Sequence, residues 1–382
     1  MDFTLSDEAR MLQDGLRRFL RDAYGAGLPP AEEETGYAPE IWRGLAEMGV
    51  VGALLPEEAG GLGGTGGDVA LVFEEMGRAG AREPLIDTGI LGAGLLAALG
   101  GADHAPLVER AVAGEAQLAF AHGEPGGRYD PWRVETRAER AGDGWRLTGR
   151  KAVVVNAPAA DHILVTARTG GAVDGGVDGG VDGAVDGAAG LSLFLVDRGA
   201  ADLRPYPLVG GGAAAEVTLE ATPATLVGPE GGAADAIAAA TARATLALSA
   251  EALGLMERCK DLTVDYLRTR RQFGRPLGKF QVLQHRMADM LIEIEQARSA
   301  VVNLAGHVDA EPAVRDRHVS ACKNLVGEAA RLVSEESIQM HGGIGLTREY
   351  ALGHHAQRLV MVDHRFGDAL FHLERFIALS AA

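Results

Sequence analysis

The spacing of apolar residues changes twice along this 382-residue chain, and these changes constrain the fold most. From Ser6 to about residue 117, apolar residues such as Leu12 and Leu16 recur at helical spacing. From about 118 to 230, short runs such as HILVTAR and LSLFLVD are separated by Gly, Asp and Pro, as in β-strands. Helical spacing then returns. The sequence predicts a multidomain α+β protein with an N-terminal helical domain (1–117), a middle β domain (118–230) and a C-terminal helical domain (231–382).

Local signals place some element boundaries. Ser6 is expected to cap the first helix, because Asp7 and Glu8 follow it in the first turn. A Gly-rich loop, Ala59–Asp68, interrupts the first domain. A Gly/Asp-rich insertion (170–190), with the repeat VDGGVDGGVDGAVDG, lies between two expected strands. The nine-residue calcium-binding repeat is absent from it, so a flexible hairpin insertion is expected.

Charge and composition restrict the partners and the compartment. The net charge of −17 disfavours binding to nucleic acid or to an anionic membrane. No apolar run reaches about 18 residues, and the N-terminus lacks the pattern of a signal peptide. Two cysteines are too few for a disulfide framework, and no HExxH-type spacing indicates a metal site. A soluble cytoplasmic protein without a metal is expected.

Two segments carry the strongest chemical signal: Arg268–Gln281, RTRRQFGRPLGKFQ, and Gln339–Gly345, QMHGGIG. Guanidinium groups in the first segment match phosphate oxygens, and the Gly-Gly pair of the second lets backbone N–H groups approach an anion. The alternative is a solvated basic helix end beside an ordinary helix C-cap. Together the segments favour a surface that grips the phosphates of a dinucleotide.

These segments belong to a longer resemblance. The chain resembles the flavin-dependent acyl-CoA dehydrogenase family over nearly its whole length. The matching motifs include GLAEMGVVGALLPEEAGGLGG, GEPGGRYD, GWRLTGRKAVVV, RRQFGRPLGKFQVLQHRMADM and QMHGGIGLTREY. The resemblance implies a middle β-barrel or β-sandwich domain, a C-terminal four-helix bundle and a tetramer. It is strongest to the small subunit of two-component, pimeloyl-CoA dehydrogenase-type enzymes.

The resemblance also implies an FAD site shared between two subunits. The pyrophosphate and adenosine side would be formed by one list of residues: Arg270, Phe273, Gln281, Gln339, Gly342 and Gly343. The ring side differs from the family pattern. Gly123 stands where a flavin-contacting hydroxyl is usual, Tyr129 replaces a small serine, and Val155 replaces the threonine whose hydroxyl reaches flavin N5. The backbone N–H of Val155 remains as a donor.

The usual catalytic base is absent from the sequence. Family members carry a glutamate at one of two positions, which correspond here to Phe366 and Ala244. Two carboxylates are candidate substitutes: Asp368, two residues beyond Phe366, and Glu251, about 10 Å from Ala244 along a helix. As alternatives, Asp368 caps the last helix and Glu251 pairs with a buried Arg or polar group.

The resemblance implies an oxidoreductase that acts on the CH–CH bond of an acyl-CoA in fatty acid metabolism. The first hypothesis is a subunit of an FAD-dependent acyl-CoA dehydrogenase whose larger paralogous partner supplies the base, with electron-transfer flavoprotein as electron acceptor. The second is a self-sufficient homotetramer that uses Asp368 or Glu251. The third is a non-catalytic scaffold subunit.

Overall fold

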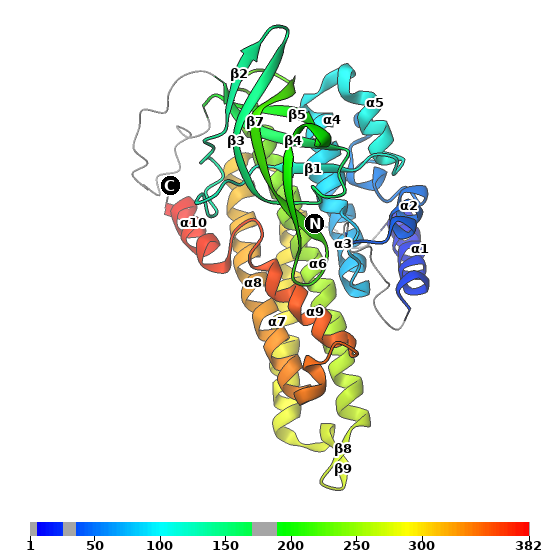
Figure 1. Ribbon diagram of the computed structural model, residues 1–382. Helices are drawn as coiled ribbons and strands as arrows, with labels where there is room; N and C mark the ends of the chain where they lie inside the picture. Colours follow the sequence, from blue (N-terminus) through cyan, green and yellow to red (C-terminus); the bar gives the residue numbers. More distant parts are fainter. Residues whose placement is uncertain (1–5, 26–35, 170–188, 382) are drawn as a thin grey trace. The chain divides into compact units, whose positions relative to one another are not determined.

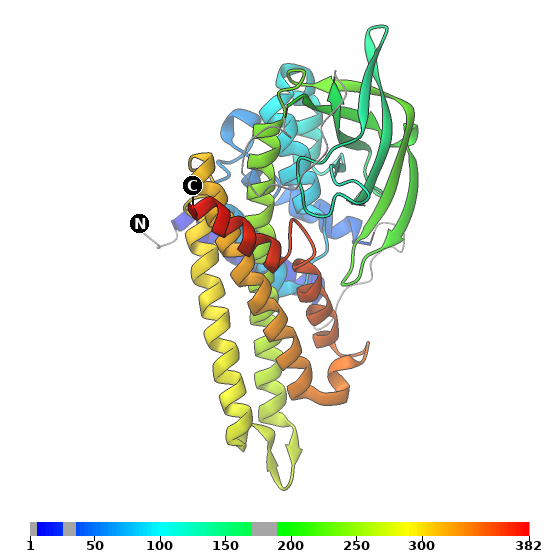
Figure 2. The same ribbon diagram turned by 90° about the vertical axis from the view of Figure 1, so that its left-hand side faces the viewer.

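The computed structural model describes residues 6–25, 36–169 and 189–381 (Figures 1 and 2). These residues form two compact units that interleave along the chain. Among the described residues, the helical unit comprises 6–25, 65–82 and 245–377, and the β unit comprises 36–64, 83–169, 189–244 and 378–381. The long helix α6 (Ala234–Thr269) contributes to both units. The predicted hairpin insertion (170–190) lies outside the described residues except for its last two.

The helical unit is built on long helices that run side by side, α6, α7 and α8 (Figure 2). Besides part of α6, its elements are α1 (Asp7–Tyr24), α3 (Gly66–Ala79), β8 (Arg271–Gln272), β9 (Arg275–Pro276), η6 (Leu277–Lys279), α7 (Gln281–Ala305), α8 (Pro312–His341), η7 (Gly342–Leu346), α9 (Ala351–Val362) and α10 (Ala369–Ala381). Helix α1 packs on α3, α3 on α7, and α9 on α8. The C-terminal helical domain predicted from the spacing is therefore confirmed.

The helix caps follow the sequence signals closely. The Ser6 hydroxyl accepts a hydrogen bond from the Ala9 N–H at 3.1 Å, as predicted for an N-cap. Helix α3 begins with a capping box, in which Thr65 accepts from the Asp68 N–H at 3.2 Å and Asp68 accepts from the Thr65 N–H at 3.1 Å. The Gly-rich loop thus ends at Thr65 rather than at Asp68.

Helix α6 is long and apolar enough to span a membrane, judged by length and composition alone. However, 72% of its most apolar window is buried within the protein. Leu246 and Leu255 are fully buried along it. Burial of this kind is typical of a central helix that packs against its neighbours on several sides.

In the described residues, the β unit contains a seven-stranded sheet with the order β1-β4-β2-β3-β7-β5. Strand β6 pairs with β7, and β5 also pairs with β4, so the sheet closes on itself. The strands are β1 (Leu118–Ala121), β2 (Arg137–Ala141), β3 (Gly144–Val155), β4 (His162–Thr169), β5 (Leu191–Asp197), β6 (Asp202–Pro207) and β7 (Ala213–Val227). Closure of this kind confirms a barrel-like β domain and removes most free strand edges.

The interior of the sheet is apolar. Trp145 of β3 packs edge-on against Phe194 of β5 with 5.4 Å between ring centroids. Leu147, Ile163 and Val217 complete the centre of this core and are almost fully buried. Since β3, β4, β5 and β7 have clear apolar runs, the sequence predicts them.

The remaining elements of the β unit are helical: α2 (Pro39–Glu47), η1 (Gly52–Leu54), η2 (Glu57–Ala59), a π-helix η3 (Leu85–Ala93), α4 (Gly94–Leu99), α5 (Gly101–Val112) and η5 (Arg198–Ala200). The π-helix packs on β1, where Thr88 accepts a hydrogen bond from the Leu118 N–H at 3.2 Å. The N-terminal region is therefore helical, as predicted, but it is divided between the two units.

Candidate functional site

The segment after α6 forms a short hairpin that ends in an exposed aromatic ring. Strands β8 and β9 are joined by Phe273 and Gly274, whose φ angles are +52° and +77°. Positive φ at both positions is typical of the tight turn that suits a two-residue hairpin. Arg275 lies over the ring of Phe280 at 4.0 Å, which stiffens the base of the hairpin. The Phe273 side chain is 88% exposed.

Arg270, where α6 meets the hairpin, is held by its backbone and leaves its side chain available. Its N–H donates to Tyr266 O at 2.8 Å, and its carbonyl accepts from the Leu277 N–H at 2.9 Å. The residue is exposed. Among the described residues, its guanidinium has no hydrogen-bond or ion-pair partner. An arginine whose backbone is held by hydrogen bonds and whose guanidinium is unpaired is suited to binding an external anion.

The structure brings the Gly-Gly turn next to this segment. The ring of His341, the last residue of α8, stacks on Tyr266 at 4.5 Å. His341 Nδ1 donates to Ser337 O at 2.8 Å, so Nε2 is left to accept from the Tyr350 hydroxyl at 3.2 Å. The two motifs therefore converge through the ends of α6 and α8.

The turn itself is open to a ligand. Gly342 ends α8 with a φ of +66°, which explains this glycine by backbone geometry. Gly343 does not have a positive φ, and a Cβ on it would meet no other atom within 4 Å. The fold of this chain thus gives no reason for glycine at 343. Close approach of a phosphate group does give one, so the residues present fit the phosphate side of FAD.

The six residues expected on the phosphate side share one property, since all are exposed: Arg270, Phe273, Gln281, Gln339, Gly342 and Gly343. Gln281 is the first residue of α7, and Gln339 lies in the last turn of α8. All six belong to the helical unit. Val155, the residue expected on the ring side, lies at the end of β3 in the β unit, opposite Ala214 of β7.

Strand β3 is irregular where the resemblance places the ring side. The β3–β7 register shifts between Lys151 and Val154, and Val153 in this bulge has a φ of +52°. A left-handed backbone is strained for a β-branched residue. The Val153 N–H donates to Glu216 Oε1 at 3.2 Å, and Tyr206 donates to the same carboxylate oxygen at 2.8 Å. Burial, followed by the hydrogen bond to Glu216, raises the pKa of Tyr206 to about 12.

A buried ion pair organises the loop beside this bulge. Lys151 has no exposed surface, and its Nζ donates to Glu124 Oε1 at 2.7 Å and to Thr166 Oγ1 at 3.1 Å. Glu124 also accepts from the Thr136 N–H at 3.0 Å and from the Glu135 N–H at 2.6 Å. The pair thereby fastens both ends of the loop that contains GEPGGRYD to β3.

The pKa values of this pair report the opposing effects of burial and attraction. Burial lowers the pKa of Lys151 to about 8, although Glu124 acts in the opposite direction. For Glu124, burial raises the pKa, but the Lys151 ammonium and three hydrogen bonds outweigh it and hold the pKa below its usual value. At neutral pH both groups are therefore charged.

The turn Phe366–Asp368 is held on every side. Phe366 and Gly367 have φ angles of +60° and +107°. His372 Nε2 donates to Phe366 O at 2.9 Å, and Lys323, which is fully buried, donates to Gly367 O at 2.6 Å. Asp368 Oδ1 accepts from the Phe371 N–H at 2.7 Å, as an N-cap of α10 does. These hydrogen bonds fix the turn, which holds Phe366, not a carboxylate, where the resemblance leads one to expect the base.

The second base position holds no carboxylate either. Ala244 is fully buried in α6. Glu251, on the same helix, is 5% exposed, and its Oε1 accepts from Arg358 Nε at 2.5 Å. This carboxylate oxygen is thus engaged in an ion pair with Arg358, whose side chain is partly exposed. This geometry favours a structural role for Glu251.

Two buried lysines, Lys151 and Lys323, are not among the residues predicted from the sequence. Lys151 interrupts the apolar pattern of β3, and Lys323 occupies a core position of α8 between Val319 and Val326. A lysine at a core position is a signal that was available, because such residues are rarely buried without a partner. Their partners, however, lie far away in the chain.

Comparison with known proteins gives a consistent result across the chain. Models of the acyl-CoA dehydrogenase N-terminal, middle and C-terminal domains match residues 6–104, 119–219 and 231–363. The acyl-CoA dehydrogenase IpdE2 of Mycolicibacterium smegmatis is 31% identical over 320 residues, which cover 84% of this chain and 81% of the relative.

Solved structures agree. A variant of the Tcur3481-Tcur3483 steroid ACAD is 31% identical with a TM-score of 0.84, covering 99% of both chains. The ChsE4-ChsE5 complex from Mycobacterium tuberculosis is 25% identical with a TM-score of 0.85, covering 100% of this chain and 99% of the other. This chain belongs to the acyl-CoA dehydrogenase family, whose members are FAD-dependent oxidoreductases acting on the CH–CH bond of acyl-CoA thioesters.

Proposed function

We propose that this chain is one subunit of a two-component acyl-CoA dehydrogenase, to which it supplies the phosphate side of an FAD site while a paralogous subunit supplies the base. The observation that carries this proposal is the contrast between the expected phosphate side and the expected base positions. The phosphate side presents an unpaired Arg270 and an open Gly343. Both base positions lack a carboxylate.

The contacts of the two candidate carboxylates also support a base supplied by another subunit. Glu251 is tied to Arg358, and one oxygen of Asp368 is tied to the first turn of α10. Removal of an α-proton needs a carboxylate that is free to accept it. A base from another subunit meets this need without disturbing either contact.

Two structural relatives are described as pairs of different chains, the ChsE4-ChsE5 complex and Tcur3481-Tcur3483. Their similarity over nearly the full chain supports a hetero-oligomer of the same kind. We further propose a cytoplasmic location and electron-transfer flavoprotein as the electron acceptor.

The reaction divides between the cofactor and the protein. When bound, FAD accepts the hydride that leaves the β-carbon of the acyl-CoA. In this chain, Arg270 would bind the pyrophosphate, Phe273 would pack against the cofactor, and Gln339 would contact the adenosine side. The Lys151–Glu124 pair would hold the loop on the ring side in place.

The visible spectrum of the purified protein tests the proposal. Expressed alone, the chain should be colourless or contain substoichiometric flavin, and co-expression with the paralogous subunit should restore colour and turnover. In the co-expressed protein, Arg270→Gln should lower flavin content, whereas Arg331→Gln, at an exposed arginine on α8, should not. Full flavin and full turnover in the isolated chain would overturn the proposal.

Two other functions predict different outcomes. In a self-sufficient homotetramer, Asp368→Asn or Glu251→Gln should abolish flavin reduction by substrate in the isolated protein. Of the two, Asp368 is better placed, because it is partly exposed and forms no ion pair within the described residues. In a scaffold subunit, Arg270→Gln should leave the activity of the partner unchanged.

A further inference from the structure

A second cationic region lies in the helical unit, apart from the flavin-binding residues. It is a cavity of about 220 Å³ lined by α1, α3, α6 and α9. Four arginines line it: Arg17 and Arg21 of α1, Arg78 of α3 and Arg258 of α6. Only two carboxylates, Glu75 and Asp261, share the lining. The wall therefore carries excess positive charge in a chain whose net charge is −17.

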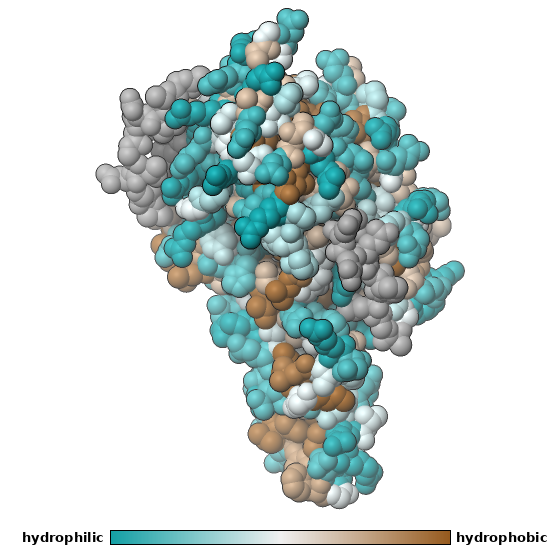
Figure 3. All heavy atoms as spheres, viewed as in Figure 1, coloured by the Kyte–Doolittle hydropathy of each residue, from teal (hydrophilic) through white to brown (hydrophobic). Residues whose placement is uncertain are grey.

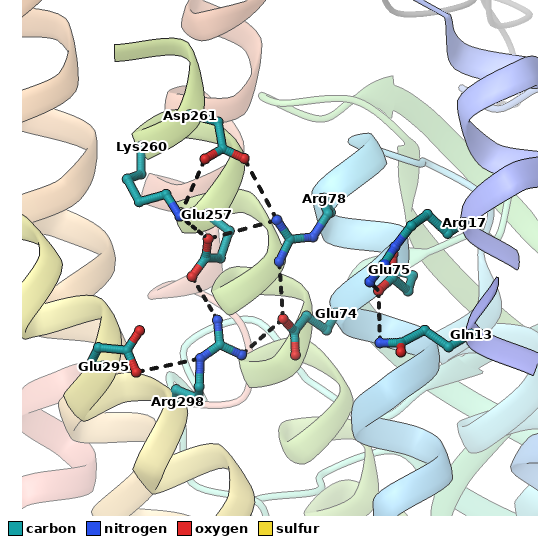
Figure 4. A network of polar contacts seen from close by, with 10 residues as sticks. All are labelled: Gln13, Arg17, Glu74, Glu75, Arg78, Glu257, Lys260, Asp261, Glu295 and Arg298. Carbon is teal, nitrogen blue, oxygen red and sulfur yellow. Dashed lines mark hydrogen bonds and ion pairs between the residues drawn. The ribbon is translucent and has the colours of Figure 1, made fainter. Parts of the chain in front are cut away.

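Two of the arginines are already compensated, as Figure 4 shows. Arg17 NH2 lies 2.6 Å from Glu75 Oε1, and Glu75 is almost fully buried. Arg78 contacts Glu74 at 3.3 Å and Asp261 at 3.8 Å. These pairs belong to a network that fixes α1, α3, α6 and α7 together, so they form a rigid frame around the cavity.

The other two arginines are not compensated in this way. Arg258 is partly buried, and it has no hydrogen-bond or ion-pair partner in the part of the chain that the structure describes. Arg21 Nε lies 3.4 Å from Oδ1 of its neighbour Asp22, and both side chains are largely exposed. Exposed ion pairs of this kind contribute little free energy, so an incoming anion can replace Asp22 as the partner of Arg21 at little cost. Two guanidinium groups thus remain available at one cavity.

The pKa of His355, on α9, reflects the positive electrostatic potential in this region. Burial lowers its pKa to about 3, and Arg258, Arg358, His354 and Arg82 act in the same direction. The ring is therefore neutral at physiological pH and contributes no charge of its own. Positive potential in a partly enclosed cavity favours an anion over water.

We propose that this cavity binds a small, multiply charged oxyanion through Arg258 and Arg21. Guanidinium groups match phosphate and carboxylate oxygens equally well in geometry. The cavity is below the size of a typical site for a nucleotide or a coenzyme. The ligand class is therefore a free phosphate-type or dicarboxylate anion. Because the cavity joins four helices, bound anion stabilises the helical unit.

Calorimetric titration of the purified protein with pyrophosphate, and separately with malonate, tests the site and distinguishes the two anion types. We expect saturable binding of one of them and a rise in Tm with its concentration. Arg258→Gln should weaken this binding by on the order of tenfold or more. In Arg270→Gln, which removes the cation of the flavin phosphate side, the binding that depends on Arg258 should remain, which separates this cavity from that side. Arg331→Gln controls for the loss of one surface charge.

Arg21→Gln provides a second variant, because this exposed side chain can be replaced without disturbing the fold. It should also weaken binding, and the weakening should persist when ionic strength is matched with KCl. The proposal is overturned if neither anion binds, if Arg258→Gln and Arg21→Gln bind as the unaltered protein does, or if only Arg270→Gln abolishes binding.

Discussion

At the scale of single residues, the Lys151–Glu124 pair is the contact whose loss should cost most in the β unit. Lys151→Met would leave the Glu124 carboxylate buried without its cation. We expect the free energy of unfolding to fall by about 3 kcal/mol or more. Urea denaturation monitored by circular dichroism would measure the change.

A surface pair in the same unit supplies the comparison. Arg140 NH2 lies 2.6 Å from Glu230 Oε2, and both side chains are exposed. Glu230→Gln should lower the free energy of unfolding by less than about 1 kcal/mol. The double variant Lys151→Met/Glu124→Gln should recover part of the loss, because the uncompensated charge is removed. Equal costs at the buried and surface pairs would contradict this account.

His372 should make stability depend on pH. Burial lowers its pKa to about 4, and the nearby Lys323 and Arg375 act in the same direction, whereas the hydrogen bond to Phe366 O opposes them. Between about pH 6.5 and 4 the unfolded chain therefore binds a proton that the folded chain does not. Stability should fall as pH decreases through this window, by about 2 kcal/mol from this residue at pH 4.5.

The variant His372→Gln keeps a donor for Phe366 O but removes the titrating ring. Urea denaturation at pH 7 and at pH 4.5 should show a smaller acid-induced loss in this variant. His364→Gln, at an exposed histidine two residues before the turn Phe366–Asp368 begins, should retain the full acid-induced loss of stability. If His364→Gln and His372→Gln have the same pH profile, burial of His372 is not the cause.

At the scale of elements, the two glycines that follow α8 are expected to have different roles, Gly342 for the backbone conformation and Gly343 for FAD binding. Gly342→Ala forces a left-handed backbone on alanine and should lower stability by about 1 kcal/mol. Gly343→Ala meets no steric obstacle within the chain, so Tm should change little. We nevertheless expect Gly343→Ala to weaken FAD binding, measured by flavin retention on dialysis of the co-expressed protein. Unchanged retention would show that no phosphate group approaches this glycine closely.

Elements with a strong periodic pattern could be predicted from the sequence, and those without one could not. Strands β3 and β5 carry apolar runs and were predicted. Strand β2, RAERA, has one buried residue, and β6, DLRPYP, contains two prolines, so neither has a strand pattern of its own. Both are strands because β7, β3 and β4 offer hydrogen-bond partners, which is information that local sequence does not contain.

The candidate site shows the same limit. The exposed Arg270 and the turn at Gly342 could be predicted, because phosphate recognition depends on local motifs. The partner of Glu251 could not be identified, since Arg358 is distant in sequence and lies on another helix. The cavity lined by Arg258 and Arg21 also forms only through tertiary packing, so no sequence motif predicts it.

At the scale of the whole molecule, assembly with other subunits should depend on α10. Leu370, Leu373 and Ile377 recur at helical spacing and are 64%, 42% and 60% exposed. Figure 3 shows further apolar side chains on the surface of the helical bundle. Exposed apolar groups of this kind mark interaction surfaces, and tetramers are typical of acyl-CoA dehydrogenases. We expect α10 to pack against another subunit.

The double variant Leu370→Asp/Ile377→Asp tests this expectation, because it places two charges where apolar side chains would be buried. Losing that burial should weaken assembly by about 3 kcal/mol or more per interface, which raises the dissociation constant on the order of a hundredfold. Light scattering after size-exclusion chromatography, with and without the paralogous subunit, should then report a lower molar mass. Glu374→Gln, on the same helix and exposed, should assemble normally. If the double variant keeps the original mass, the apolar face of α10 does not hold the subunits together.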